Sequence, residues 1–276
     1  MNAGSQHWAA QHKGAFGIAL RGCGRLFLTG LALTLSLAMT ACGGSSASSA
    51  SGGSSNSGTT TTKVSVNLTN ALFSSVTNGI VAPSLSITGT YNNVTVTGTG
   101  SYTRAPATST TFDGNPASSQ EVTLVTGTLT ETGGATVIVP NAVGYLYSSS
   151  ALDTIGVTTV DSTGAVTEYD AATTPIPYPT TITVGASGAL STFNRFTDAT
   201  MDTYLGSNDW AYSVLANGSS TNSVILQVMQ QIYDSGSTNP TIITTDYVVT
   251  SAGVMTLQSL RITILGVQDL TYTAAS

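Results

Sequence analysis

The sequence predicts an all-β protein, either an antiparallel β-sandwich or a curved half-barrel, with mostly meander or hairpin connections. Thr, Val, Ile and Tyr dominate residues 63–276, and Gly, Asn, Asp and Pro interrupt them at short intervals. Apolar and polar residues alternate between these interruptions, which is typical of an antiparallel sheet with one wetter face. No long stretch of this region shows a convincing helical period of about 3.6 residues.

The alternation marks the first strands in chain order. They start from the segments 64–68, 85–87, 94–96, 122–124 and 145–147. Two further segments, 155–160 and 165–169, flank the tetrapeptide Asp-Ser-Thr-Gly at 161–164. Because Asp and Gly favour tight turns, this tetrapeptide predicts a hairpin.

The clearest strand covers residues 223–233. One of its faces carries Val224, Leu226, Val228 and Ile232. Turn sequences at 234–237 and 251–253 lead to strands over 242–249 and 260–264. The remaining pattern allows one turn of helix near 71–76 or near 198–205.

A proline-rich segment interrupts the pattern at 173–179, where three prolines alternate with other residues. Proline cannot donate to a sheet, so this segment cannot be a central strand. It is the best internal boundary, and it divides residues 63–276 into possible halves 63–172 and 180–276. We interpret it as a crossover within a single domain rather than as a linker between two domains.

The N-terminus has the three parts of a secretory signal peptide. Lys13, Arg21 and Arg25 precede an uncharged, Leu-rich run over 26–39, and small residues follow it. At about 1.5 Å per residue the run is too short to span a bilayer as a helix. Residues 1–41 are therefore predicted to be a signal peptide.

The hexapeptide Leu-Ala-Met-Thr-Ala-Cys at 37–42 resembles a bacterial lipobox. The resemblance implies that Cys42 begins the mature chain and carries acyl chains, palmitate among them. By the same resemblance, Gly43 in place of Asp after the Cys implies a location at the outer membrane. An ordinary cleaved signal with an incidental Cys is the alternative. Residues 43–62 contain only Gly, Ser, Ala, Asn and Thr, so 42–62 is predicted to be a lipidated, disordered tether.

Composition excludes several classes of chemistry. Both histidines, His7 and His12, and every cysteine other than Cys42 lie in the predicted signal peptide. The mature chain therefore lacks the residues for Ser-His-Asp or Cys-His catalysis and for the usual zinc sites. Thirteen acidic residues against four basic ones leave it at −9, which excludes a nucleic-acid partner. We predict no enzyme, no cofactor and no metal.

Carboxylates are the remaining candidates for a site. Paired carboxylates support glycoside hydrolysis without histidine, but Glu121, Glu131 and Glu168 lack a motif and are expected to be solvated charges on strand faces. Oxygens from the region 198–209 are a candidate calcium site, formed by Asp198, Asp202, Asn208 and Asp209. Asp and Asn are also ordinary turn residues, and the alternative of a turn stays open.

Other residues are expected to have structural roles. Arg195, close to Asp198 in sequence, is expected to form an ion pair rather than an anion site. Asp113-Gly114 is expected to form a tight turn. Tyrosines and Trp210 either fill the core or form a sugar- or partner-binding face.

Two segments carry a looser resemblance. They are 111–117 followed by the strand 122–130, and 179–190 continuing to 194–198. They resemble segments of uncharacterised Gram-negative outer-membrane lipoproteins with a lipobox, a Ser/Gly-rich tether and an all-β body. That family implies a location but no activity, and no functional residue is transferred from it.

A transmembrane β-barrel is an alternative for such a location. Its strands need about 9–11 residues and an apolar outer face. The strands predicted here are mostly shorter and Thr-rich on one face, which disfavours it.

Three functions remain in competition for this lipid-anchored cell-envelope protein. A non-catalytic interaction module predicts an exposed aromatic patch and a filled core. A carrier of lipid or another apolar ligand predicts a cavity lined by residues such as Leu226, Val228 and Ile262. A histidine-free hydrolase predicts two clustered carboxylates in a cleft. The sequence favours the first, with acyl chains on Cys42 as the membrane contact and an unidentified protein or glycan as the partner.

Overall fold

The computed structural model describes residues 63–275. The predictions for the signal peptide 1–41, the tether 42–62 and the lipidated Cys42 lie outside the described residues. Within 63–275 the chain is all-β with one helix, as the sequence predicts. This part of the chain contains no helix long and apolar enough to cross a membrane.

The elements follow one another closely along the chain. In order they are β1 (Ser65–Asn67), α1 (Leu68–Asn78), β2 (Ile80–Tyr91), β3 (Val94–Arg104), β4 (Thr108–Phe112), β5 (Asn115–Thr126), β6 (Thr128–Glu131), β7 (Thr136–Ile138), β8 (Ala142–Ser148), β9 (Thr154–Val160), β10 (Val166–Ala172), β11 (Thr181–Thr183), β12 (Ser187–Phe196), β13 (Tyr204–Ala216), β14 (Ser223–Asp234), β15 (Thr241–Thr250), β16 (Met255–Ile264) and β17 (Gln268–Ala274).

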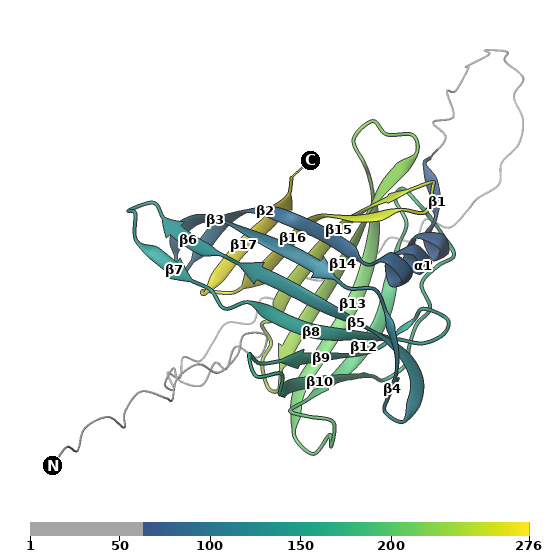
Figure 1. Ribbon diagram of the computed structural model, residues 1–276, viewed down its shortest axis with the longest axis horizontal. Coiled ribbons are helices and arrows are strands. Elements are labelled where there is room, and N and C mark those ends of the chain that lie inside the picture. Colours follow the sequence, from purple (N-terminus) through teal and green to yellow (C-terminus); the bar gives the residue numbers. More distant parts are fainter. Residues whose placement is uncertain (1–62, 276) are drawn as a thin grey trace, which may run out of the picture. The chain divides into compact units, whose positions relative to one another are not determined.

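Twelve of these strands form a closed antiparallel barrel within the described residues. Strands β8 to β10 and β12 to β17 form a meander, β17 pairs with β2, and β3 pairs with β5 to close the ring. Figure 1 shows β2, β3, β5, β8, β9 and β10 crossing in front of β13 to β16. The predicted sandwich or half-barrel is therefore wrong, whereas the antiparallel meander is confirmed.

The closure depends on pairings that the local pattern does not encode. Residues 100–104 of β3 meet residues 122–126 of β5, and β17 meets β2 from the far end of the chain. Period-two alternation specifies that a segment is a strand, but it does not specify its distant neighbour. Strand β17 was also not predicted, although Gln268, Leu270 and Tyr272 alternate on its buried face.

The barrel places its apolar side chains inside. On β14 the predicted shared face turns inward, with Val224, Leu226 and Val228 buried and Ile232 partly buried against the core. The exposed side chains of the pair β2 and β3 include Ser86, Thr88, Thr90, Thr95, Thr97 and Thr99. Eight of the twelve barrel strands span 10 to 13 residues, so the expectation that most strands are shorter than this is wrong for the barrel. The Thr-rich face is present and lies on the outside.

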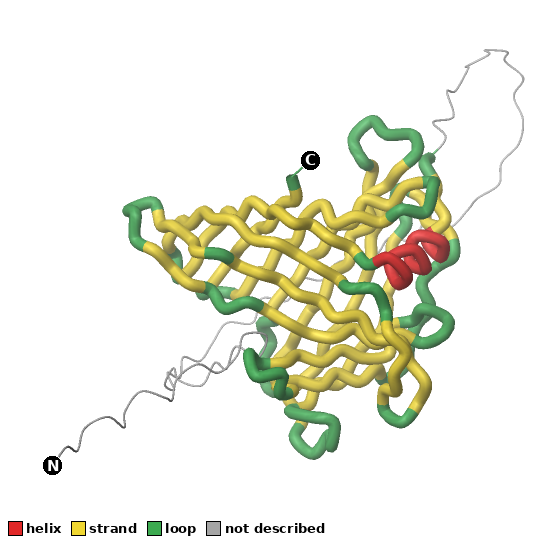
Figure 2. The backbone as a smooth tube through the Cα atoms, viewed as in Figure 1, coloured by secondary structure: helices red, strands yellow, loops and turns green. Residues whose placement is uncertain are grey.

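Helix α1 lies beside one end of the barrel (Figure 2). The side chain of Asn67 accepts a hydrogen bond from the backbone of Asn70 and caps the helix. Leu68, Ala71 and Leu72 are buried against the core, so the predicted helical turn near 71–76 is confirmed. The region 198–205 contains turns and the start of β13 instead.

The proline-rich segment 173–179 joins neighbouring strands. On either side of it, β10 and β12 pair directly, with Asp170 opposite Arg195. The short sheet of β1 and β11 contributes Val66 and Ile182 to the same core. Both sequence halves therefore supply strands to the barrel and to one continuous core.

Candidate functional site

A cavity of about 160 Å³ lies inside the barrel. Inward-facing residues of β3, β5, β8, β9, β13, β14, β15 and β16 line it, and α1 contributes Leu72 and Val76. Most of the lining is apolar, including Leu124, Leu146, Val228, Ile243, Met255 and Leu260. Protein interiors are otherwise close-packed, so a space of this size inside a barrel is a binding-site candidate.

The residues predicted for a carrier lie in this region. Leu226 and Val228 line the cavity, as expected. Ile262 is buried in the core on β16 but lies outside the lining. Trp210, for which the sequence left a core role and a binding role open, both packs in the core and lines the cavity. It contacts Phe193 with 5.2 Å between ring centroids.

Arg104 is the one charged residue in the lining among the described residues. It is the last residue of β3 and is 8% exposed. Its Nε donates to Oε1 of Gln120 at 2.9 Å, and its Nη2 donates to the same oxygen. All thirteen acidic residues lie in the described part, and the ion pairs there use Glu168, Asp234 and Asp269 instead.

Backbone groups hold Gln120 in place beside Arg104. Gln120 is 1% exposed, and its amide nitrogen donates to the carbonyl oxygens of Ser75 and Ala105, each at 2.9 Å. Gly79 ends α1 with a φ of 74°, and a Cβ there would lie 2.5 Å from the Arg104 carbonyl oxygen. Glycine is therefore required where the helix end meets this strand.

Tyrosine hydroxyls add neutral polar groups to the cavity wall. The hydroxyls of Tyr102 and Tyr247 lie 3.4 Å apart. Burial raises the pKa of Tyr102 well above its usual value of 10, with a further contribution from Tyr247. Burial also raises the pKa of Tyr178, which lines the same cavity. These phenols therefore stay protonated and can donate hydrogen bonds at neutral pH.

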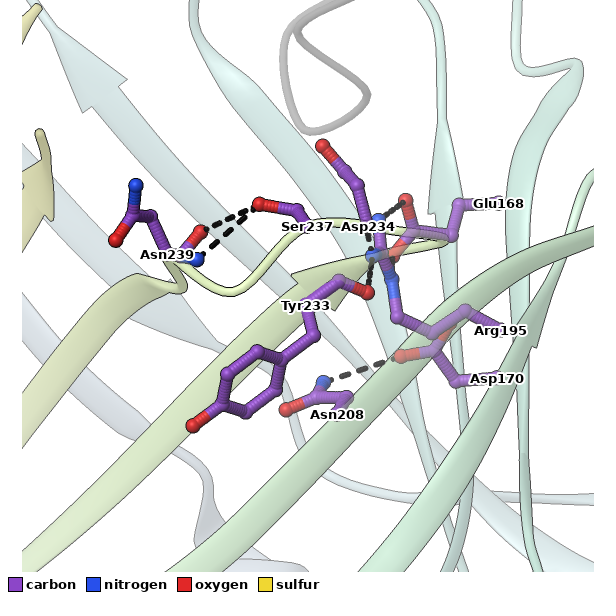
Figure 3. A network of polar contacts seen from close by, with 8 residues as sticks. All are labelled: Glu168, Asp170, Arg195, Asn208, Tyr233, Asp234, Ser237 and Asn239. Carbon is purple, nitrogen blue, oxygen red and sulfur yellow. Dashed lines mark hydrogen bonds and ion pairs between the residues drawn. The ribbon is translucent and has the colours of Figure 1, made fainter. Parts of the chain in front are cut away.

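A second polar cluster surrounds Arg195 near the turn after β14 (Figure 3). Its Nε and Nη2 donate to the two carboxylate oxygens of Glu168 at 2.9 Å each. Its Nη1 donates to the Tyr233 carbonyl oxygen and to Asp234. The predicted ion pair is therefore present, with partners other than Asp198. The expectation that Glu168 is solvated is wrong, because it is 6% exposed.

A chain of hydrogen bonds joins Asp170, which lies opposite Arg195 in the strand pairing, to the cavity wall. Asn208 donates to Asp170 at 3.1 Å and accepts from the indole of Trp210 at 2.9 Å. Asp170 is 2% exposed, and its other carboxylate oxygen has no hydrogen-bond partner among residues 63–275. Burial, followed by the charge of Glu168, raises the pKa of Asp170 well above its usual range.

The carboxylates of this cluster differ from what a hydrolase needs. Glu168 and Asp170 are close neighbours, as that hypothesis requires, but Arg195 occupies both oxygens of Glu168. Neither carboxylate is in the lining of the cavity. The geometry therefore stabilises the barrel wall and presents no acid and base pair to a substrate.

The remaining candidates are scattered. Asp198 accepts two hydrogen bonds from Thr200 in an exposed turn, whereas Asn208 is buried against Asp170. Within 63–275, no three His, Cys, Asp or Glu residues gather as metal ligands. Glu121 is exposed, and Glu131 lies on β6. Asp113-Gly114 forms the predicted turn, between β4 and β5.

Arg104 is a functional candidate that was not predicted from the sequence. The available signal was its spacing from Tyr102 and Gly100, since alternate residues share a face of a strand. Its partner Gln120 becomes its neighbour only through the pairing of β3 with β5.

No protein-family model, curated protein or solved structure matches this chain.

Proposed function

We propose that this domain is a non-catalytic binding protein that holds a small apolar ligand inside its barrel. The observation that carries the proposal is the mainly apolar cavity of about 160 Å³, which the buried core residues surround. An engineered cavity of about 150 Å³ lined by apolar residues stays dry and binds benzene. The apolar part of the ligand is therefore about the size of a benzene ring or a short branched chain.

The alternative of a surface interaction module receives less support. It requires a filled core and an exposed aromatic patch, and the two most exposed aromatic residues lie in different elements. Phe73 is on α1 and Tyr204 begins β13. The lipid anchor at Cys42 and the outer-membrane location complete the proposal, with acyl chains as the membrane contact.

The test uses fluorobenzene, a neutral probe, and ligand-observed ¹⁹F NMR. The full chain is reconstituted in lipid nanodiscs, and empty nanodiscs correct for partitioning into lipid. We expect saturable binding to the wild type and at least about tenfold weaker binding to Ala142→Leu, which fills the cavity with three further carbon atoms.

Ala211→Leu is the matched control. Ala211 lies on β13 next to Trp210, and because alternate residues face opposite sides its side chain faces away from the cavity. It should bind fluorobenzene as the wild type does. Absence of saturable binding to the wild type, or equal binding by Ala142→Leu, would refute the proposal.

A further inference from the structure

We infer that the ligand of this cavity is a small monocarboxylic acid with an apolar body, and that Arg104 binds its carboxylate. This inference rests on the proposed function and adds the chemical class of the ligand. Three features of the cavity support it: an unbalanced buried charge, an open edge on the guanidinium, and a lining that matches one negative charge.

The charge of Arg104 is buried without a counter-ion. The residue is 8% exposed, and none of the thirteen acidic residues, all in the described part, forms an ion pair with it. A buried cation is unfavourable unless an anion and hydrogen bonds compensate it. The amide of Gln120 accepts hydrogen bonds from one edge of the Arg104 guanidinium but does not neutralise its charge, so an anionic ligand completes the site.

The guanidinium retains donors for that anion. Nε and Nη2 both donate to Oε1 of Gln120, and no hydrogen bond is made by Nη1 within residues 63–275. Guanidinium has five N–H donors in a planar fork that matches a carboxylate. The two backbone contacts of Gln120 fix the occupied edge, which leaves the end with Nη1 for the ligand. The neutral hydroxyls of Tyr102 and Tyr178 supply further donors in the same lining.

The charge and the volume of the cavity together narrow the chemical class of the ligand. Arg104 is the single charged lining residue in the described part, so one negative charge neutralises the site, and a dianionic phosphate ester would leave an excess. The rest of the lining is mainly apolar and about large enough for a ring. A monocarboxylate on a small aromatic or branched aliphatic body meets both conditions.

Arg195 shows how the same barrel compensates a buried arginine when no ligand is needed. Both edges of its guanidinium are occupied, by Glu168 on one side and by Asp234 and a backbone carbonyl on the other. Arg104 has a neutral amide where Arg195 has a carboxylate. The difference lies at the cavity, where a ligand can supply the missing group.

The experiment compares 4-fluorobenzoate with the neutral 4-fluorobenzyl alcohol by ¹⁹F NMR, on the full chain in nanodiscs at neutral pH. We expect the wild type to bind the benzoate about 10- to 100-fold more tightly, because hydrogen bonds to charged groups have this strength. Arg104→Met should lose this preference. Arg261→Met, at an exposed arginine outside the cavity, should keep it.

Fluorobenzene separates failure of this inference from failure of the proposed function. If the wild type binds fluorobenzene but prefers the alcohol or binds both probes equally, the inference is overturned and the proposed function stands. If Arg104→Met still prefers the benzoate, the anion binds elsewhere and the inference is overturned. If fluorobenzene does not bind the wild type, the proposed function itself fails. Binding of fluorobenzene to Arg104→Met reports that its cavity is intact, and the wild-type preference is decisive if that variant does not fold.

Discussion

Two buried arginines, at opposite ends of the barrel interior, receive different partners from the same fold. Arg104 lies beside the end of α1, with Gln120 as its partner. Arg195 lies beside the turn that follows β14, with Glu168 and Asp234 as partners. The exposed fractions are similar, 8% and 5%, so the degree of burial does not explain the difference. Carboxylates of the chain itself thus compensate the buried charge of Arg195, whereas Arg104 has no such counter-ion among the described residues.

The register of the strands determines which arginine receives a carboxylate. Arg195 lies opposite Asp170 in the pairing of β12 with β10, and Glu168 is two residues along the same inner face. Arg104 lies opposite Val122 in the pairing of β3 with β5, and the residue two positions along that face is Gln120. Two diagonal positions with the same geometry therefore hold a carboxylate and an amide, which allows the two sites to be compared by substitution.

The largest effect is expected from Arg195→Met. Removing the cation leaves Glu168 as an uncompensated buried charge, which costs about 3–5 kcal/mol of unfolding free energy. Chemical denaturation monitored by circular dichroism measures it. The double variant Arg195→Met/Glu168→Gln should recover part of the loss, because the orphaned charge is gone. A loss below about 1 kcal/mol in the single variant would contradict this account of the ion pair.

Asp170→Asn tests the same end of the barrel through pH. The raised pKa of Asp170 means that the folded state holds its proton above the usual range near 3.8, where the unfolded chain has released it. The contribution of Asp170 to wild-type stability should therefore fall by about 1.4 kcal/mol per pH unit, from pH 3.8 up to the folded-state pKa. Asp170→Asn removes this contribution, so the variant should match the wild type near pH 4 and exceed it at pH 8. Urea denaturation at both pH values measures the difference in unfolding free energy between Asp170→Asn and the wild type. A difference that is the same at pH 4 and pH 8 would contradict the raised pKa.

Arg104→Met should change the stability of the ligand-free protein by less than about 1 kcal/mol. The substitution leaves the buried Oε1 of Gln120 without its two donors, which costs about 1–3 kcal/mol, but it also removes a buried charge that has no counter-ion, and the two effects oppose each other. Denaturation under the conditions used for Arg195→Met provides the comparison. A loss of 3 kcal/mol or more would mean that Arg104 is compensated within the chain, and the contrast between the two arginines would disappear.

The sequence predicts the parts of this fold that depend on near neighbours. Alternation places Leu226 and Val228 on the inner face, and Asp161 to Gly164 forms a turn in which the Asp161 carboxylate accepts from the backbone of Thr163. Ring closure and the burial of Glu168 depend instead on which strands pair. From the sequence alone Glu168 is expected to be a solvated charge, because its partner Arg195 is 27 residues away and contacts it only through the pairing of β10 with β12.

The cavity was predictable only as one outcome among three. Its volume depends on how side chains from eight strands and one helix fill a closed ring, and alternation specifies the direction of each side chain but not the space left between them. Arg104 illustrates the same limit. Its spacing from Tyr102 indicates that its side chain points inward. That its partner is the amide of Gln120, and not a carboxylate, follows only from the register between β3 and β5.

The smallest effect is expected at a third arginine, which is exposed. Arg261 donates to Asp269 at 2.6 and 2.7 Å, and the side chains are 56% and 40% exposed. The Arg261 hydrogen bonds lower the pKa of Asp269, so this contribution is present at neutral pH and lost in acid. Solvent screens the pair, and Arg261→Ala should cost about 0–1 kcal/mol at low salt and less at 1 M salt. Denaturation at both salt concentrations measures this, and a loss as large as that of Arg195→Met would show that burial does not control the strength of these pairs.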